Sequence, residues 1–307
     1  MDRREFLWKG LGGAALAGTA LAVGDYHRVF ATPAGMPAAM PDLVAVKGGE
    51  PAAMFDKAIE ACGGMGRFVA RGKKVLVKPN IGWDVSPERG GNTHPALVRR
   101  IIEHCFNAGA KEVRVFDHSC DNWRSTYKNS GIEQAVNAAG GKIVSGDSES
   151  YYQSVAVPRG KNLTEAKVHE LLLDADVFIN VPILKHHGSS VVTIGMKNLM
   201  GVVWDRGFWH RNDLHQCIAD FSTYRRPDLI VVDAYYVMKQ NGPRGISADD
   251  VVKMMSQIVS TNIVGADAAA ARLYGVDPAE IPYINEAEQL GLGTKDLEHL
   301  SIKRIRL

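Results

Sequence analysis

The feature that most constrains this chain is an alternation between short runs of β-branched and aliphatic residues and longer segments with helical periodicity. Such alternation is typical of α/β folds, in which helices connect parallel strands and cover both faces of a sheet. The apolar runs predict strands at residues 43–46, 74–77, 113–116, 142–144, 177–181, 229–232, within 253–260, and 300–305. We therefore expect an α/β fold with a mostly parallel sheet, helices on both faces, and a site at the carboxyl ends of the strands.

Residues 93–109 illustrate the helical segments. Thr93 is suited to capping a helix, Pro95 fits its first turn, and Gly109 marks its end. The apolar residues between them fall on one face: Leu97, Val98, Ile101, Ile102, Cys105 and Phe106. Cys105 is therefore expected in the core and not in a site.

The first 31 residues are organised like an export signal. Arg3 and Arg4 precede a Gly/Ala-rich stretch at 10–23, and the segment ends in Val29-Phe30-Ala31, which we interpret as the exit of the signal. The pattern resembles a twin-arginine signal, although Asp2 and Trp8 depart from it. It predicts a periplasmic or otherwise exported protein, with the twin-arginine export machinery as a partner. The alternative is an anchoring N-terminal helix, but the apolar stretch is shorter than the ~20 residues of a membrane span.

Composition bounds the rest of the chain. With 36 Lys+Arg against 34 Asp+Glu, the net charge of +2 over 307 residues gives no basic footprint for nucleic acid. A Pro/Ala-rich linker at 32–41 leads into residues 42–307, which we predict to form a single α/β domain without a stable membrane span. The four cysteines are scattered with no CxxC pair, so no ferredoxin-type iron–sulfur motif is present.

Polar residues follow several of the predicted strands, at the edge where ligands bind in open α/β sheets. A further apolar run at 192–194 precedes one of these groups of polar residues. The residues at the strand ends are Lys78 and Asn80, Asp117, Asn180 and Lys185, Lys197 and Asn198 after the run at 192–194, and Asp233. Each of them alone could be a surface lysine, a helix cap or a turn residue. Their recurrence at five strand ends favours a shared binding site.

Three lysines dominate this predicted site. If Lys78, Lys185 and Lys197 line one cleft, their mutual repulsion requires an anion between them, such as a phosphate or a carboxylate. Alternatively, burial and neighbouring charge lower the pKa of one lysine, which then serves as a base or nucleophile. The sequence leaves both alternatives open, and both predict that the three ammonium groups share one pocket.

Histidines form a second group near the same strand ends. They are His94, His118, His186, His187, His210 and His215. Imidazole beside carboxylates suits a transition metal, with His187 and His215 as candidate ligands, although no motif has fixed metal-ligand spacing. Neighbouring side chains on extended backbone face opposite ways, so His186 and His187 cannot both enter one pocket. We place His186 with the lysines as a catalytic candidate.

Several of these segments resemble the domain of unknown function 362 family. The matching blocks are Lys74–Ile81, Thr93–Pro95, Asp174–Gly188, Gly195–Gly201, Asn241–Pro243 and Gly265–Gly275. The resemblance implies a fold and a site but no settled reaction, since members are widely exported or fused to ferredoxin modules and their role is largely unassigned. Two departures are the Lys185-His186-His187-Gly188 block, where Lys-Thr-His-Gly is usual, and the missing ferredoxin cysteines.

Three functions remain open from the sequence. The first is an exported enzyme acting on a small anionic substrate or holding a metal or organic cofactor in a Lys/His/Asp-lined cleft. The second is a non-catalytic periplasmic binding or maturation protein for an anion, metal or cofactor, and the third is a subunit of an exported redox complex. The candidate ligand-binding residues are Asn80, His94, Asp117, Asn180, Asn198, Asp233 and Asn241.

Overall fold

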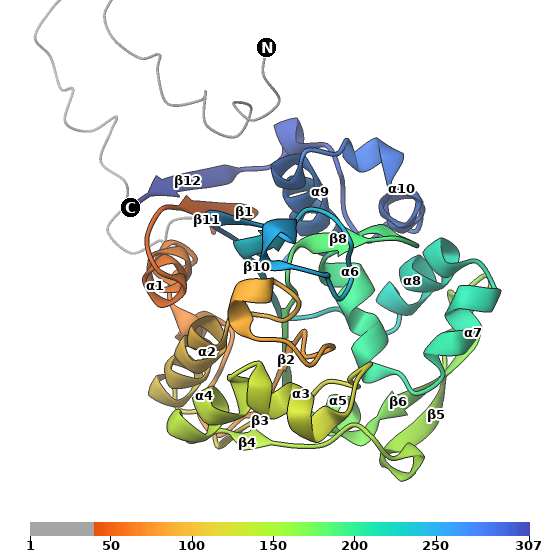
Figure 1. Cartoon of the computed structure of the whole chain (residues 1–307), viewed down its shortest axis with the longest axis horizontal. Coiled ribbons are helices and arrows are strands. Elements are labelled where there is room, and N and C mark those ends of the chain that lie inside the picture. The colour runs from red at the N-terminus through yellow and green to blue at the C-terminus, as the bar shows by residue number, and fades with distance from the viewer. Residues whose placement is uncertain (1–39) are drawn as a thin grey trace, which may run out of the picture.

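The computed structural model describes residues 40–307 (Figure 1). Eight strands form one sheet in the order β12-β1-β11-β10-β7-β2-β3-β4. Their bounds are Leu43–Lys47 (β1), Lys74–Pro79 (β2), Glu112–Val115 (β3), Lys142–Ile143 (β4), Val177–Val181 (β7), Leu229–Met238 (β10), Val251–Ser260 (β11) and Ile302–Arg306 (β12). β11 is antiparallel to both of its neighbours, and the other neighbouring strands pair in parallel. The predicted mostly parallel sheet is therefore confirmed.

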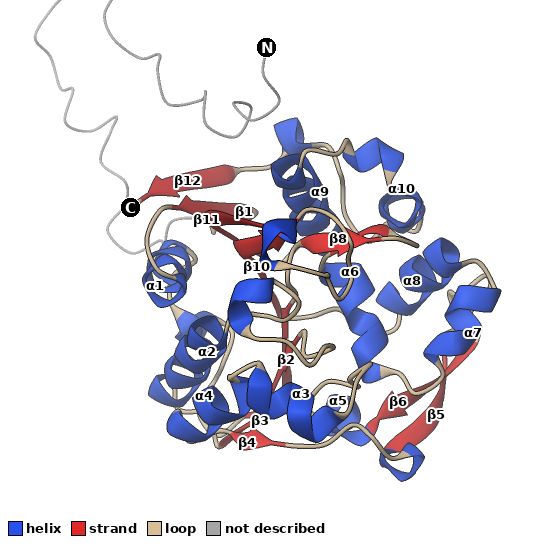
Figure 2. Cartoon of the chain, viewed as in Figure 1, coloured by secondary structure: helices blue, strands red, loops and turns tan. Residues whose placement is uncertain are grey.

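Helices cover both faces of this sheet (Figure 2). One face packs against α1 (Pro51–Ala61), α2 (Pro95–Asn107), α3 (Trp123–Asn129) and α4 (Ile132–Ala138). The other packs against α5 (Glu170–Asp174), α6 (Gly195–Asn198), α7 (Arg206–Arg211), α8 (Leu214–Ser222), α9 (Ile263–Tyr274) and α10 (Pro282–Gln289). Strands buried on two faces are apolar throughout, which is why the continuous runs predicted them.

All eight predicted strands belong to this sheet, with small differences in their ends. The largest difference is β10, which continues to Met238 because it pairs with β11 over its outer half. Asp233 therefore lies within a strand and not after one. The helix at 95–107 is also confirmed and buries Cys105, but its N-cap is His94, whose Nδ1 accepts the Ala96 N–H at 3.2 Å. Thr93, the predicted cap, instead donates its hydroxyl to the Val181 carbonyl.

Two small antiparallel sheets lie outside the main one, and the sequence did not predict them. β5 (Tyr152–Ala156) pairs with β6 (Glu165–His169), and β8 (Lys185–His187) pairs with β9 (Val191–Thr193). The run at 192–194 was expected to end a strand of the main sheet. Its first two residues belong instead to β9 and Ile194 is the N-cap of α6, so Lys197 reaches the site from α6 and not from the sheet edge.

No helix among residues 40–307 is long and apolar enough to cross a membrane. The predicted export signal at 1–31 and most of the linker at 32–41 lie outside the described residues.

Candidate functional site

A cavity of about 360 Å³ opens at the carboxyl ends of β2 and β3. Its lining includes Lys78, Asn80, Asp117, His118, Cys120, Lys185, His187, Lys197, Asn198, Met200, Gly201, Arg206 and His210. The three lysines predicted to share a pocket therefore do so. β2 and β3 supply one side of the cavity because neighbouring parallel strands bring their carboxyl ends to a single edge.

Lys78 forms a buried ion pair with Asp117. The Lys78 Nζ lies 2.8 Å from Asp117 Oδ1, and it also donates to the Pro79 carbonyl and to Asn198 Oδ1, both at 3.0 Å. Asp117 Oδ2 accepts the Ile81 N–H at 2.7 Å. Burial lowers the pKa of Lys78, and Asp117 opposes that effect. This lysine is therefore held in place by its own neighbours.

Gly201 lets the backbone approach this ion pair. A Cβ at position 201 would lie 1.8 Å from Asp117 Oδ1 and 2.6 Å from Lys78 Nζ, so no side chain fits. The Gly201 carbonyl accepts the His118 N–H at 3.0 Å, which ties the turn after α6 to the end of β3. The glycine is thus required by close packing at the site, although its φ is not in the left-handed region.

Asn198 connects the lysines through a network of amide groups. Its Oδ1 accepts from Lys78 and from the Asn80 amide at 3.0 Å, and its Nδ2 donates to Asn180 Oδ1 at 2.8 Å. Asn80 Oδ1 in turn accepts from the Lys185 Nζ at 3.1 Å. These partners are neutral, so they orient the ammonium groups without cancelling their charge.

The short helix α6 is fixed from behind by Asp267 of α9. The Asp267 carboxylate accepts the Gly195 and Met196 N–H groups at 2.8 and 3.0 Å, and a Cβ on Gly195 would lie 2.7 Å from Asp267 Oδ1. Burial raises the pKa of Asp267 to about 7, against the lowering effect of these two hydrogen bonds. The contact sets where Lys197 and Asn198 enter the cavity.

Lys197 and Lys185 are buried ammonium groups with strongly lowered pKa values. Burial lowers the pKa of Lys185 to about 7 and that of Lys197 to about 8. Lys185 donates to the Gly91 carbonyl and to Asn80, whereas the Lys197 Nζ donates to Met200 Sδ at 3.0 Å. Lys197 is only 9% exposed, so in the described part of the chain its charge meets a thioether, a weak acceptor, and not an oxygen.

Arg206, which sequence reasoning missed, adds a fourth cation to the cavity lining. Its guanidinium donates to the His118 and Ser119 carbonyls at 2.7 and 3.1 Å and lies 3.5 Å from Cys120 Sγ. Asp117 is the lining carboxylate. The only signal that could have found Arg206 is its place shortly after the Gly195–Gly201 block. The lining therefore has an excess of positive charge.

Three histidines reach the cavity, and His187 rather than His186 is the member of the adjacent pair that does so. Burial and the nearby lysines lower the pKa of His187 to about 2, and its Nδ1 accepts the Ser189 N–H at 3.1 Å. The His118 Nδ1 donates to the Val203 carbonyl at 3.0 Å, which leaves Nε2 as its acceptor. Burial also lowers the pKa of His118 and His210.

The remaining candidates lie outside the cavity lining. His186 Nδ1 accepts the Gly242 N–H, and Asn241 donates to Asp250. Asp233 accepts the His94 and Tyr235 N–H groups at 2.7 and 3.0 Å, so it ties the start of α2 to β10. Asn180 contacts the site indirectly, because its Oδ1 accepts a hydrogen bond from Asn198 Nδ2 at 2.8 Å.

His215 was paired with His187 as a candidate metal ligand. It stacks on Tyr283, with ring centroids 5.9 Å apart, and does not line the cavity. Within residues 40–307 no group of three or more His, Cys, Asp or Glu side chains is arranged to hold a metal ion.

The same segments that build the cavity carry a match to a known family. A family model described as a domain of unknown function, DUF362, matches residues 75–272. The chain belongs to the DUF362 family. The match runs from β2 to α9 and so contains every lysine, asparagine and histidine that lines the cavity.

Relatives of this DUF362 chain come from sequence and from structure. It is 28% identical over 242 residues to the thylakoid-associated protein sll1697 of Synechocystis sp., covering 76% of this chain and 73% of the relative. Two solved structures are similar at 12% identity. One is a Thermotoga maritima protein with a TM-score of 0.47, covering 78% of this chain and 60% of that one. The other is the lactate racemase apoprotein of Thermoanaerobacterium thermosaccharolyticum, with a TM-score of 0.44, 83% of this chain and 58% of that one.

Proposed function

We propose that this DUF362 protein binds a small anionic molecule, a phosphate or a carboxylate, in the lysine-lined cavity. The observation that carries the proposal is Lys197, a buried ammonium beside a thioether in a cavity that also holds Lys78, Lys185 and Arg206. Burying a cation without an anionic partner costs several kcal/mol in proteins. An anion that enters the cavity recovers this cost, so the charges favour binding.

The bound anion is a substrate in our proposal, because the cavity also offers groups that exchange protons near neutral pH. Lys185, with its pKa lowered to about 7, exists partly as a free amine at pH 7 and suits a general base. His118 presents an unprotonated Nε2. Lys197, with a pKa of about 8, stays charged at pH 7 and stabilises negative charge on the substrate.

Calorimetric titration of the full chain with inorganic phosphate and with acetate tests the binding step. Lys197→Met keeps the length and apolar stem of the side chain but removes its charge, so we expect it to weaken binding at least tenfold. Lys128→Met, on the exposed surface of α3, is the matched control and should bind as the unmodified chain does. Equal anion affinity in the two variants would show that Lys197 does not take part in anion binding.

Turnover is tested separately by proton NMR of small phosphomonoesters and hydroxycarboxylates incubated with the protein. If the protein converts one of these compounds and Lys185→Met does not, the result supports the proposal that the protein is an enzyme. Binding without conversion of any of them favours the second candidate function, a non-catalytic binding protein, in which the same charges hold the anion without using Lys185 as a base.

We further propose that the protein is exported, as the Arg3-Arg4 segment predicts, and the thylakoid-associated relative is compatible with a location outside the cytoplasm. N-terminal sequencing of the protein recovered from fractionated cells tests this. A mature chain that begins near Thr32 in the periplasmic fraction supports export, and a cytoplasmic chain that retains Met1 or Asp2 contradicts it.

A further inference from the structure

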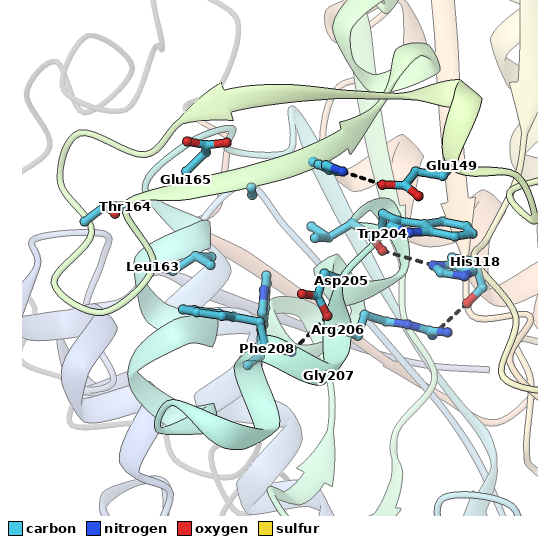
Figure 3. A pocket seen from close by; sticks show the side chains of 14 residues that line it. His118, Glu149, Leu163, Thr164, Glu165, Trp204, Asp205, Arg206, Gly207 and Phe208 are labelled. Atoms are coloured by element: carbon cyan, nitrogen blue, oxygen red, sulfur yellow. Dashed lines mark hydrogen bonds and ion pairs between the residues drawn. The ribbon is translucent and has the colours of Figure 1, made fainter.

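A second hollow, of about 680 Å³, is lined by the side chains drawn in Figure 3 and shares two lining residues with the lysine-lined cavity. It lies between strand β6 with the turn before it and residues 203–209, which run into α7. We call it the aromatic groove, because Trp204, Phe208 and Trp209 are among its lining residues together with Leu163, Ala166 and Val203. Trp204 and Phe208 are half-buried, so part of each ring remains open to the groove.

The groove and the cavity meet at two side chains. His118 and Arg206 line both hollows. The His118 ring stacks on Trp204 with centroids 4.9 Å apart and an interplanar angle of 3°, and Figure 3 shows the two rings one above the other. Arg206 is held on the His118 and Ser119 carbonyls. A molecule that occupies both hollows must therefore pass beside an imidazole and a guanidinium.

The two hollows differ in charge. The cavity combines Lys78, Lys185, Lys197 and Arg206 with one carboxylate, Asp117. The groove combines Lys167 and Arg206 with three carboxylates, Glu149, Glu165 and Asp205, and Lys167 is paired with Glu149. An anionic group is thus attracted to the cavity and repelled from the groove, which fixes the direction in which an elongated ligand binds.

Resting on the proposed function, we propose that the ligand is an aromatic anion, with its phosphate or carboxylate in the lysine cavity and its ring in the aromatic groove. Apolar and aromatic walls favour a flat ring, which stacks on tryptophan and phenylalanine and displaces water from their exposed faces. The linking atoms lie beside Arg206 and His118. The groove selects for the body of the ligand, and the lysines select for its charge.

Calorimetric titrations of the full chain with matched pairs of ligands test this: inorganic phosphate against phenyl and benzyl phosphate, and acetate against phenylacetate. We expect the better aryl member of a pair to bind about tenfold more tightly than its parent anion. Trp204→Ala and, independently, Phe208→Ala should bring this ratio close to one. Trp123→Ala, which removes a half-buried tryptophan that lines neither hollow, should preserve the ratio. Circular dichroism checks that each variant folds.

The outcomes separate this inference from the proposed function. Parent anions that bind without any aryl advantage overturn the aromatic groove and leave the anion site standing. An aryl advantage that survives both Trp204→Ala and Phe208→Ala places the ring elsewhere and also overturns the inference. If neither the parent anions nor their aryl derivatives bind, the proposed function fails and this inference fails with it.

Discussion

At the scale of single residues, the buried lysines of the cavity favour anion binding but destabilise the unliganded protein. Lys185 and Lys197 are buried with neutral partners, and the pKa of each is lowered by that burial. A protein selected only for stability would place apolar side chains here, since isosteric replacement of buried charge is often neutral or stabilising. Keeping the ammonium groups therefore indicates a functional requirement.

Lys197→Met should make the unliganded protein more stable while removing anion binding. The pKa of Lys197 is about 8 in the folded chain and near 10.5 in the unfolded chain. Between pH 8 and pH 10.5 this side chain is therefore more fully protonated in the unfolded state than in the folded state. The penalty is fully present below pH 8 and disappears as pH rises toward 10.5. We expect a gain of about 1–3 kcal/mol in unfolding free energy at pH 7 and little gain at pH 10.5. Urea denaturation at both pH values measures it, and a loss of stability at pH 7 would contradict the assignment.

Gly201→Ala tests the close approach at the ion pair. The added methyl group overlaps Asp117 Oδ1 at 1.8 Å, so Lys78 and Asp117 must separate or the turn must shift. Breaking a buried pair costs about 3–5 kcal/mol. We expect a loss of this size in urea denaturation together with weaker phosphate binding. Gly188→Ala is a suitable control, since nothing lies within 4 Å of its added Cβ. Comparable losses in the two variants would show that the effect is not specific to the ion pair.

At the scale of elements, the sequence predicted what depends on local pattern. The eight strands of the sheet are continuous apolar runs, and the helix at 95–107 has a clear stripe and a proline in its first turn. The strands β5, β6 and β8 escaped prediction because polar residues interrupt them, so no continuous apolar run marks them. An apolar run does mark β9, but its sequence does not show that it pairs outside the main sheet. The His94 cap was missed because imidazole is an uncommon capping group beside threonine.

The hairpin β5–β6, which forms one wall of the aromatic groove, is held at its turn by Asp220 of α8. One carboxylate oxygen, Oδ2, accepts the N–H groups of Lys161, Asn162 and Leu163 at 2.9, 2.7 and 2.9 Å. Asp220→Asn removes the charge that makes these bonds strong, so we expect a loss of about 1.5–3 kcal/mol. Faster proteolytic cleavage within 157–164 than in the unmodified chain would show local loosening. Unchanged cleavage would mean that the turn is held by other contacts.

At the scale of the whole molecule, the lysine cavity follows from the sheet topology. Neighbouring parallel strands bring Lys78 and Asn180 to adjacent register positions, which is why strand-end residues far apart in sequence could be predicted to meet. Arg206 and the aromatic groove could not, because they depend on how the segment after α6 packs against the β5–β6 hairpin. The exchange of His186 for His187 also needed the structure, since alternation shows that one of two faces the cavity but not which.

The stability of the whole fold should therefore respond to anions in a pH-dependent way. A ligand that binds only the folded state adds about 2.7 kcal/mol at 100 times its Kd. Sulfate keeps its charge between pH 6 and pH 10, whereas Lys197 loses its proton around pH 8 and Lys185 around pH 7. Sulfate should consequently raise the melting temperature most at pH 6, less at pH 8 and least at pH 10, and the rise should be small throughout in Lys197→Met. Calorimetric melts of both proteins, with Lys128→Met as control, measure the rise. The charge of sulfate does not change over that range. Protection that stays constant from pH 6 to pH 10 would therefore show that the bound anion is not held by these two lysines.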